Sequence, residues 1–200
     1  MNKKHLLLTL LLAFVVGIGN AWGADYTYSS FATTFYKGTK NGTDISTQVQ
    51  STTMMTTIAN SGAANFSIAS VSNCYYNTSG AGIRISKSSG AGSITFNLSD
   101  ALKDSTIYAI VVFASKVANN TKAILDVTPA GGYSTPTNYS NSTLKDYSSS
   151  TIATYKLDTI KVGGKQLTSI TFASASGGYT MLHGITLVTQ TELAAKKPGV

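Results

Sequence analysis

The clearest alternation of apolar and polar residues in the chain runs from Gly82 to Leu98. Apolar residues take every second position on both sides of a Gly/Ser turn at 87–92. This period is typical of two antiparallel strands, each with one face on a core and the other in water. We therefore predict a β-hairpin here, with Arg84 on the face opposite the core side chains.

Short apolar segments continue along the chain, separated by Gly, Ser and Asn turns. Besides the predicted hairpin, the expected strands lie at about 25–35, 66–70, 105–115, 123–127, 151–157, 167–173 and 179–188. The run at 105–115 is apolar at consecutive positions, which is typical of a central strand covered on both faces. Residues 128–150 form a long polar insertion with Gly, Pro and three tyrosines.

These features predict an all-β protein with an antiparallel, jelly-roll-like β-sandwich. An α/β fold is excluded because no helices separate the strands. We expect at most one short helix, over residues 53–59, where apolar residues lie four positions apart. Ser51 or Thr52 can cap its start and Gly62 can stop it, whereas the many Thr residues argue against a longer helix.

The N-terminus has the pattern of a secretion signal. Basic residues at 3–5 precede an apolar run at 6–18, and small residues flank Trp22, which predicts cleavage before Ala24. The run is shorter than the roughly 20 residues that a spanning helix needs, and no second apolar segment of such length follows. We therefore expect an exported chain with no membrane span in its mature form, located outside the cell or on its surface, with the periplasm as the alternative.

The chain divides into three expected parts. Residues 1–23 form the signal peptide, residues 24–189 one β-sandwich domain, and residues 190–200 a linker-like tail. The tail ends in an Ala-Ala-Lys-Lys-Pro-Gly stretch whose composition is typical of a linker. This composition indicates further domains beyond Val200.

Charge argues against a nucleic-acid partner. Without Lys3 and Lys4, 13 of the 15 basic side chains remain against 8 acidic ones. The lysines are scattered, with no run longer than Lys196-Lys197, whereas a nucleic-acid binder gathers its basic residues on one face or groove. The expected role of these lysines is a solvated surface.

Metal and thiol chemistry have little basis in the sequence. Cys74 is the only cysteine, so it can form neither an intramolecular disulfide nor a thiolate metal site alone, and we expect it to be a small buried hydrophobe. No dense Asp/Asn loop is present. We therefore predict no metal and no cofactor, with a structural calcium between loops as the alternative left open.

The residues for catalysis are few. After the signal peptide, His183 is the only histidine and Glu192 the only glutamate. A Ser-His-Asp triad needs the histidine between a serine and an aspartate. His183 shares strand parity with Met181 and Ile185, which predicts a partly buried structural histidine unless Gly184 marks a bulge. We expect no enzyme activity and no catalytic residues.

Four segments together carry a family resemblance: 68–71, 82–96, 110–116, and 169–174 followed by 184–187. Their strands and turns resemble the β-sandwich (jelly-roll or galactose-binding-like) accessory modules of secreted and surface-exposed bacterial proteins, over residues 65–189. In that family a basic residue usually precedes the last apolar pair of the terminal strand, and His183 takes about that place. The resemblance implies a module that lies beside catalytic or adhesive domains and binds glycans or other surface components.

Sugar binding usually needs exposed aromatic planes with polar groups beside them. The only tryptophan, Trp22, belongs to the signal peptide, so tyrosines and the single arginine remain. The candidate ligand-binding residues are Arg84, Tyr75, Tyr76, Tyr133, Tyr139 and Tyr179. We predict a non-catalytic secreted or surface module that binds glycan as an accessory domain of a larger protein. The alternative is a structural or adhesive spacer of a cell-surface protein with no small-molecule ligand.

Overall fold

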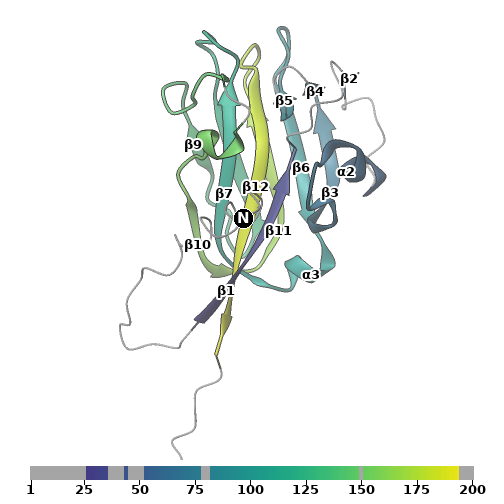
Figure 1. Cartoon of the computed structure of the whole chain (residues 1–200), viewed down its shortest axis with the longest axis vertical. Coiled ribbons are helices and arrows are strands. Elements are labelled where there is room, and N and C mark those ends of the chain that lie inside the picture. Colours follow the sequence, from purple (N-terminus) through teal and green to yellow (C-terminus); the bar gives the residue numbers. More distant parts are fainter. Residues whose placement is uncertain (1–25, 36–42, 45–51, 78–81, 149–150, 194–200) are drawn as a thin grey trace, which may run out of the picture.

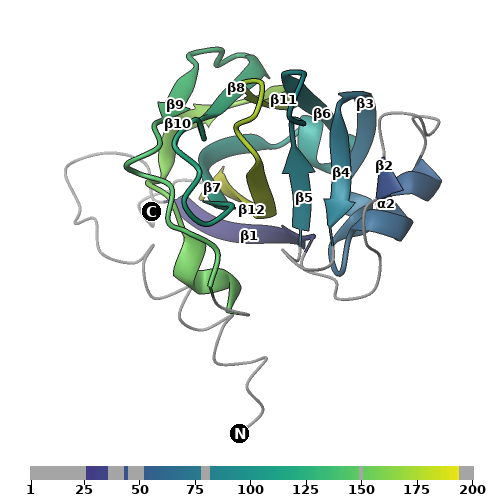
Figure 2. The same ribbon diagram turned by 90° about the horizontal axis from the view of Figure 1, so that it is seen from above.

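Two antiparallel β-sheets pack face to face in the computed structural model of the protein, which describes residues 26–35, 43–44, 52–77, 82–148 and 151–193 (Figure 1). The predicted all-β sandwich is confirmed. Seen from above, the strands of the two sheets form two layers (Figure 2). The expected signal peptide and the end of the tail lie outside the described residues.

The first sheet has seven strands in the order β10-β7-β12-β5-β4-β2, with β1 paired to β12 beside this path. Their bounds are β1 Tyr26–Thr34, β2 Thr43–Asp44, β4 Cys74–Asn77, β5 Gly82–Ile85, β7 Thr106–Lys116, β10 Ile160–Lys165 and β12 Thr180–Glu192. β12 pairs with β7 along one edge. Its other edge is shared between β5, which pairs at Thr180–Leu182, and β1, which pairs from Gly184 onward.

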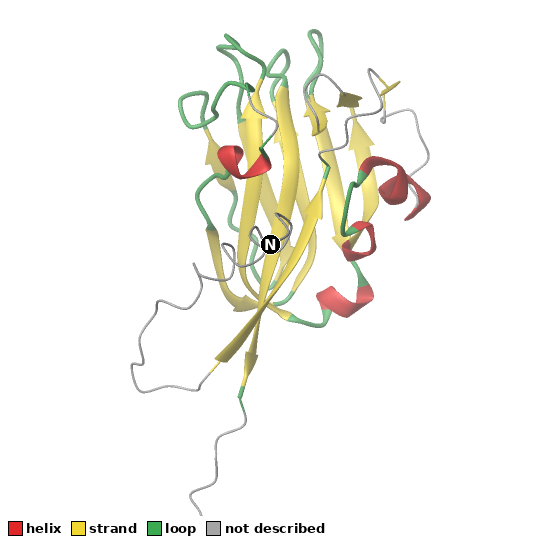
Figure 3. Cartoon of the chain, in the orientation of Figure 1, coloured by secondary structure: helices red, strands yellow, loops and turns green. Residues whose placement is uncertain are grey.

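The second sheet has five strands in the order β3-β6-β11-β8-β9. Their bounds are β3 Phe66–Ser72, β6 Gly92–Leu98, β8 Leu125–Gly131, β9 Thr137–Tyr139 and β11 Leu167–Ser174. Helices are short and lie outside the strands (Figure 3). They are α2 Thr52–Ile58 and α3 Asp100–Lys103, with the 3-10 turns η2 Ala63–Asn65 and η3 Ile152–Tyr155.

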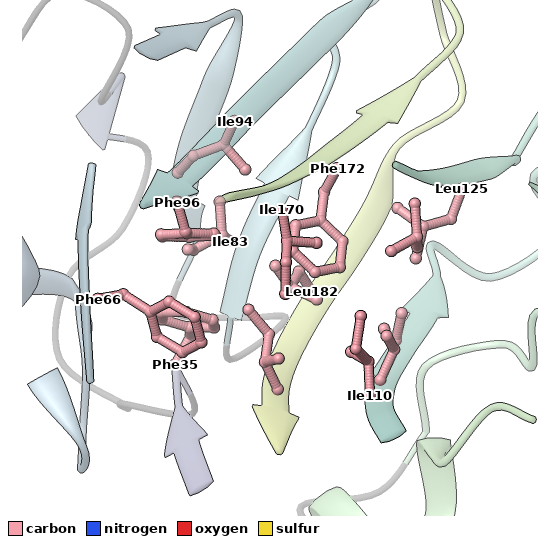
Figure 4. Close-up of a cluster of buried hydrophobic side chains, with 14 of the residues drawn as sticks. Phe35, Phe66, Ile83, Ile94, Phe96, Ile110, Leu125, Ile170, Phe172 and Leu182 are labelled. Carbon is pink, nitrogen blue, oxygen red and sulfur yellow. The ribbon is translucent and has the colours of Figure 1, made fainter. Parts of the chain in front are cut away.

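The core fills the space between the two sheets (Figure 4). Within it, the ring of Phe96 on β6 contacts three other phenylalanine rings, with centroid distances of 5.3 Å to Phe35, 5.8 Å to Phe66 and 6.0 Å to Phe172. All four rings are buried, and burying one such side chain stabilises the fold by about 1.5–3 kcal/mol. The aromatic cluster therefore joins three strands of the second sheet to Phe35, the residue that directly follows β1 of the first sheet.

The predicted hairpin between Gly82 and Leu98 is wrong. β5 pairs with β4 and β12 in the first sheet, whereas β6 pairs with β3 and β11 in the second. The chain leaves β5 at Ser86, whose φ of 80° turns the backbone away from its sheet. Strands that face each other across a core bury alternate residues as the strands of a hairpin do, so the sequence pattern does not separate the two arrangements.

The strand expected at 151–157 is also wrong, because residues Ile152–Tyr155 form the 3-10 turn η3, whereas other elements match the sequence more closely. The short helix expected at 53–59 is α2, while the four-residue helix α3 was not predicted. The apolar run at 105–115 is confirmed as a central strand: β7 lies between β10 and β12 and is buried on both faces. The expected polar insertion at 128–150 contains the end of β8 and all of β9.

The C-terminal strand is longer than the pattern predicts. β12 continues to Glu192, into the stretch expected to be linker, and pairs there with Tyr26–Tyr28 of β1. In Figure 1 this two-stranded end extends below the other strands. Residues 194–200 of the expected tail lie outside the described residues.

Candidate functional site

Arg84 lies in the middle of β5 on the outer face of the seven-stranded sheet. Its neighbours Ile83 and Ile85 are fully buried in the core, so the alternation of the strand directs Arg84 to the opposite face, as predicted. Across the sheet it pairs with Tyr75 of β4 on one side and Met181 of β12 on the other. The arginine is therefore held on a rigid element flanked by strands on both sides.

Two tyrosine rings surround the guanidinium group of Arg84. Its Cζ lies 4.7 Å from the ring centroid of Tyr75 and 5.2 Å from that of Tyr179. Tyr75 belongs to β4 and Tyr179 directly precedes β12, so the two rings come from the two strands that flank β5. Each such cation–π contact is worth about 0.5–1 kcal/mol at an exposed site, and together they fix the guanidinium plane.

The backbone beside Tyr179 is unusual. Tyr179 has a φ of 45° and Ser86 a φ of 80°, both in the left-handed region that residues other than glycine seldom adopt. The backbone N–H of Tyr179 donates to Ser86 Oγ at 3.0 Å, so a hydrogen bond connects the two residues that have positive φ. Val117 N–H donates to the Tyr179 carbonyl at 3.3 Å. This local strain places the Tyr179 ring beside Arg84.

The donors of Arg84 are not used within the described part of the protein. Its Nε is buried and has no hydrogen-bond partner there. The terminal nitrogens likewise have no hydrogen bond or salt bridge among the described residues, and they are not buried. A buried donor without an acceptor costs about 1–3 kcal/mol, and native structures leave few of them. Arg84 is therefore oriented by aromatic rings and not by a carboxylate.

The structure brings together three of the six predicted site residues, Tyr75, Arg84 and Tyr179. Tyr76 lies beside Tyr75 on β4, where only its backbone pairing with Ile83 and Thr43 is described. The remaining two, Tyr133 and Tyr139, lie in the insertion after residue 128 and form no part of this cluster.

Tyr133 and Tyr139 take part in packing. Tyr133 is partly buried against the core cluster. Tyr139 is 4 % exposed, and its hydroxyl donates to the carbonyl of Asp158 at 2.7 Å. Burial raises the pKa of Tyr139 to about 12, and the nearby carboxylate of Asp158 adds to this effect. A ring this deeply buried offers no face to a ligand from solvent.

His183 forms a second polar cluster on the outer face of the same sheet. It is fully buried, and its Nε2 lies 2.8 Å from Ser115 Oγ. Its ring centroid lies 4.8 Å from that of Tyr155 in a tilted arrangement and 5.7 Å from that of Tyr147 in a stacked one. The register of β12 shifts between Leu182 and Gly184, so the bulge considered at Gly184 is present.

This bulge changes the parity expected for β12. Leu182 lies in the core before the bulge and Ile185 after it, so the strand changes which of its alternate positions face inward. A serine nucleophile needs access to substrate, whereas Ser115 and His183 are both fully buried. The Ser–His contact therefore joins β7 to β12 and does not form a reactive surface.

Among the described residues, the cysteine and the acidic side chains do not form a further site. Cys74 is buried as expected, and its Sγ donates to the carbonyls of Ser72 at 3.3 Å and Ser93 at 3.2 Å. Within the described ranges no group of three or more His, Cys, Asp or Glu residues could hold a metal ion. The same ranges contain no helix with the length and apolar composition required to span a membrane.

The sequence analysis predicted Tyr75, Arg84 and Tyr179 as separate candidates, but it did not predict that the two tyrosines contact the arginine. Residues 78–81 separate β4 from β5, so pairing Asn77 with Gly82 places Tyr75 opposite Arg84. The four-residue spacing was the available signal for this contact. Comparison with protein-family models and with curated proteins finds no match to this chain.

Proposed function

We propose that the chain is a non-catalytic module that binds carbohydrate as an accessory domain of a larger exported or surface protein. The observation that carries this proposal is the guanidinium of Arg84, held over the rings of Tyr75 and Tyr179 with its terminal donors open. We assign these three side chains to the binding site.

The chemistry of the cluster fits a sugar. Pyranose rings present apolar faces that stack on aromatic side chains, and their hydroxyl groups need donors and acceptors at fixed positions. Tyr75 and Tyr179 are each partly exposed, and Arg84 supplies several N–H donors between them. Since strand pairing and ring contacts already orient these groups, binding would order few side chains and would lose little entropy.

The rest of the chain supports the same role. The signal-like N-terminus supports export, with the cell surface or extracellular space as the expected location and the periplasm as the alternative. The linker-like composition at 194–199 supports neighbouring domains. The resemblance to galactose-binding-like accessory modules points the same way, and β-sandwiches serve many functions, so the argument rests on the site.

Binding of the purified protein to an array of plant, host and microbial glycans tests the proposal. We expect retention on at least one glycan, with a loss of tenfold or more in affinity for Arg84→Ala and for Tyr179→Ala. Tyr26→Ala is the matched control, because Tyr26 is an exposed tyrosine on β1, outside the cluster, and should bind as the wild type does.

Thermal melts of all variants separate loss of binding from loss of folding. Silence across the whole array would contradict carbohydrate binding and favour the spacer function without a small-molecule ligand. Equal losses in Tyr26→Ala and Arg84→Ala would contradict the assignment of the site.

A further inference from the structure

We infer that the sugar bound at the Tyr75–Arg84–Tyr179 cluster is acidic: a uronic acid whose carboxylate pairs with the guanidinium of Arg84. This inference rests on the proposed function, because it names the chemical class of ligand for the same site. It is carried by the charge and the donor geometry of Arg84.

Arg84 is a cation with no ion-pair partner in the described part of the chain. The salt bridges found there involve Lys103 with Asp100 at 2.7 Å and Lys116 with Asp146 at 3.7 Å. The segment 78–81, which connects β4 to β5, contains no acidic residue. Among the side chains that the structure describes, no carboxylate therefore forms an ion pair with the guanidinium of Arg84.

One acidic residue lies in the same row across the sheet. Asp44 of β2 pairs with Tyr75, which in turn pairs with Arg84. Since neighbouring strands are about 4.8 Å apart, Asp44 lies two strands, or roughly 10 Å, from Arg84 along the sheet. The backbones of Asp44 and Arg84 are thus separated by the strand that carries Tyr75, and the two residues are not directly paired.

The available donors of Arg84 suit a carboxylate better than a hydroxyl. Its Nε is buried, so a ligand meets the two terminal nitrogens, which form one planar edge. Two parallel N–H···O bonds from such an edge match the two oxygens of a carboxylate. A neutral hydroxyl offers one oxygen and leaves the cation without a counter-ion.

Partial burial increases this preference. The Tyr75 and Tyr179 rings lie 4.7 and 5.2 Å from Arg84 Cζ and exclude water from the parts of the guanidinium that they contact, which weakens its hydration. Charge-assisted hydrogen bonds are roughly twice as strong as neutral ones, and more so where water is excluded. An anionic ligand therefore gains more than a neutral sugar of the same shape, while the tyrosine rings remain available for the sugar ring.

Paired polysaccharides that differ only at the carboxyl group test the inference. Polygalacturonate, alginate and a glucuronoxylan are each compared with their carboxyl-reduced forms by calorimetric titration of the purified protein. We expect at least one acidic polymer to bind tenfold or more tightly than its reduced form, with affinity falling as salt rises from 50 to 500 mM.

Variants of the arginine separate charge from geometry. Arg84→Gln should lose tenfold or more in affinity for the acidic polymer and should abolish the preference over the reduced form. Arg84→Lys keeps the charge but loses the planar edge, so it should bind more weakly than the wild type and more tightly than Arg84→Gln. Lys161→Gln is the matched control, since Lys161 is an exposed cation on β10 of the same sheet.

The outcomes that contradict the inference can be distinguished from those that contradict the proposed function. Equal binding to acidic and reduced polymers would overturn the inference and leave the proposed function standing, whereas no binding to any glycan would overturn both. A sulfated galactan that binds as tightly as the uronates, or an Arg84→Lys variant equal to the wild type, would overturn the carboxylate pairing. Equal losses in Lys161→Gln and Arg84→Gln would show nonspecific charge attraction and would also overturn it.

Discussion

Two clusters on the outer face of the seven-stranded sheet have similar parts and different surroundings. In one, the guanidinium of Arg84 contacts the rings of Tyr75 and Tyr179; in the other, the ring of His183 stacks on Tyr147 and contacts Tyr155 in a tilted arrangement. They are neighbours, because Met181 of β12 pairs with Arg84 on β5 and with Ser115, the hydrogen-bond partner of His183, on β7.

The two clusters differ in how far another segment of the chain buries them. The segment that contains η3 places Tyr155 and Ile152 over β12 next to Gly184, so His183 is fully buried and its Nε2 meets the Ser115 hydroxyl. No described segment covers Arg84 in this way, and its terminal nitrogens remain open. His183, which the chain covers, thus contributes to packing. We propose that Arg84, which no described segment covers in this way, contributes to ligand recognition.

Replacing the covered histidine should have the largest effect on stability. His183→Ala leaves a cavity under Tyr155 and removes the hydrogen bond of the buried Ser115 hydroxyl. We expect a loss of about 2–4 kcal/mol in the free energy of unfolding, measured by chemical denaturation, with glycan affinity unchanged in the folded variant. A loss below about 0.5 kcal/mol would contradict a structural role for this cluster.

A buried tyrosine gives the next largest effect, and it depends on pH. The pKa of Tyr139 is raised to about 12, so the folded state favours its neutral form. The resulting stability is complete below pH 10, the ordinary value for tyrosine, and is lost as pH rises from 10 to 12. A shift of about two pKa units corresponds to about 2–3 kcal/mol.

Tyr139→Phe isolates this contribution from the titration of the lysines. At pH 8 the variant should be less stable than the wild type by about 1 kcal/mol, because it loses the hydrogen bond to the Asp158 carbonyl. Between pH 10 and 12 the wild type should lose this advantage. Parallel denaturation curves of the two proteins across this whole range would contradict the burial of the hydroxyl.

The contrast between Tyr139 and Tyr179 shows what the sequence could predict. The alternation of apolar residues was enough for most of the long strands, the sandwich and the outward direction of Arg84, because burial sets which alternate positions are apolar. It missed β4 and β10, and it predicted a strand at 151–157, where the structure has the 3-10 turn η3. All six candidate residues were named from composition and local position alone. The sequence did not separate tyrosines of the insertion, such as Tyr139, from those that flank Arg84.

The missing information is non-local. Whether β5 pairs with β6 or faces it across the core depends on strand partners from distant parts of the chain, such as β11 and β12. The association of Tyr179 with Arg84 depends on the pairing of Thr180 with Ile85, residues far apart in sequence. Local indications existed for the bulge at His183, from the following Gly184, and for the pairing of Tyr75 with Arg84, from the four residues between β4 and β5.

Replacing Arg84 should have the opposite effects to replacing His183: a small change in stability and a large loss of glycan affinity. Arg84→Ala loses two contacts with tyrosine rings, each worth about 0.5–1 kcal/mol, but also removes a buried Nε without an acceptor. We expect a net change of about 1 kcal/mol or less in stability, together with the tenfold loss of glycan affinity proposed above. A destabilisation as large as that of His183→Ala would show that Arg84 holds the fold, and its ligand role would have to be given up.

The smallest expected effect tests whether the ring or the hydroxyl of Tyr75 matters. Within the described part of the chain the Tyr75 hydroxyl has no hydrogen bond, while the ring face contacts Arg84. Tyr75→Phe keeps the face, so its unfolding free energy should change by less than about 0.5 kcal/mol and its glycan affinity by less than about twofold. Tyr75→Leu removes the aromatic face, so it should lose about 0.5–1 kcal/mol and bind several-fold more weakly. If Tyr75→Phe binds as weakly as Tyr75→Leu, the hydroxyl itself contacts the ligand, and the open cluster recognises sugar through hydrogen bonds from tyrosine as well as from Arg84.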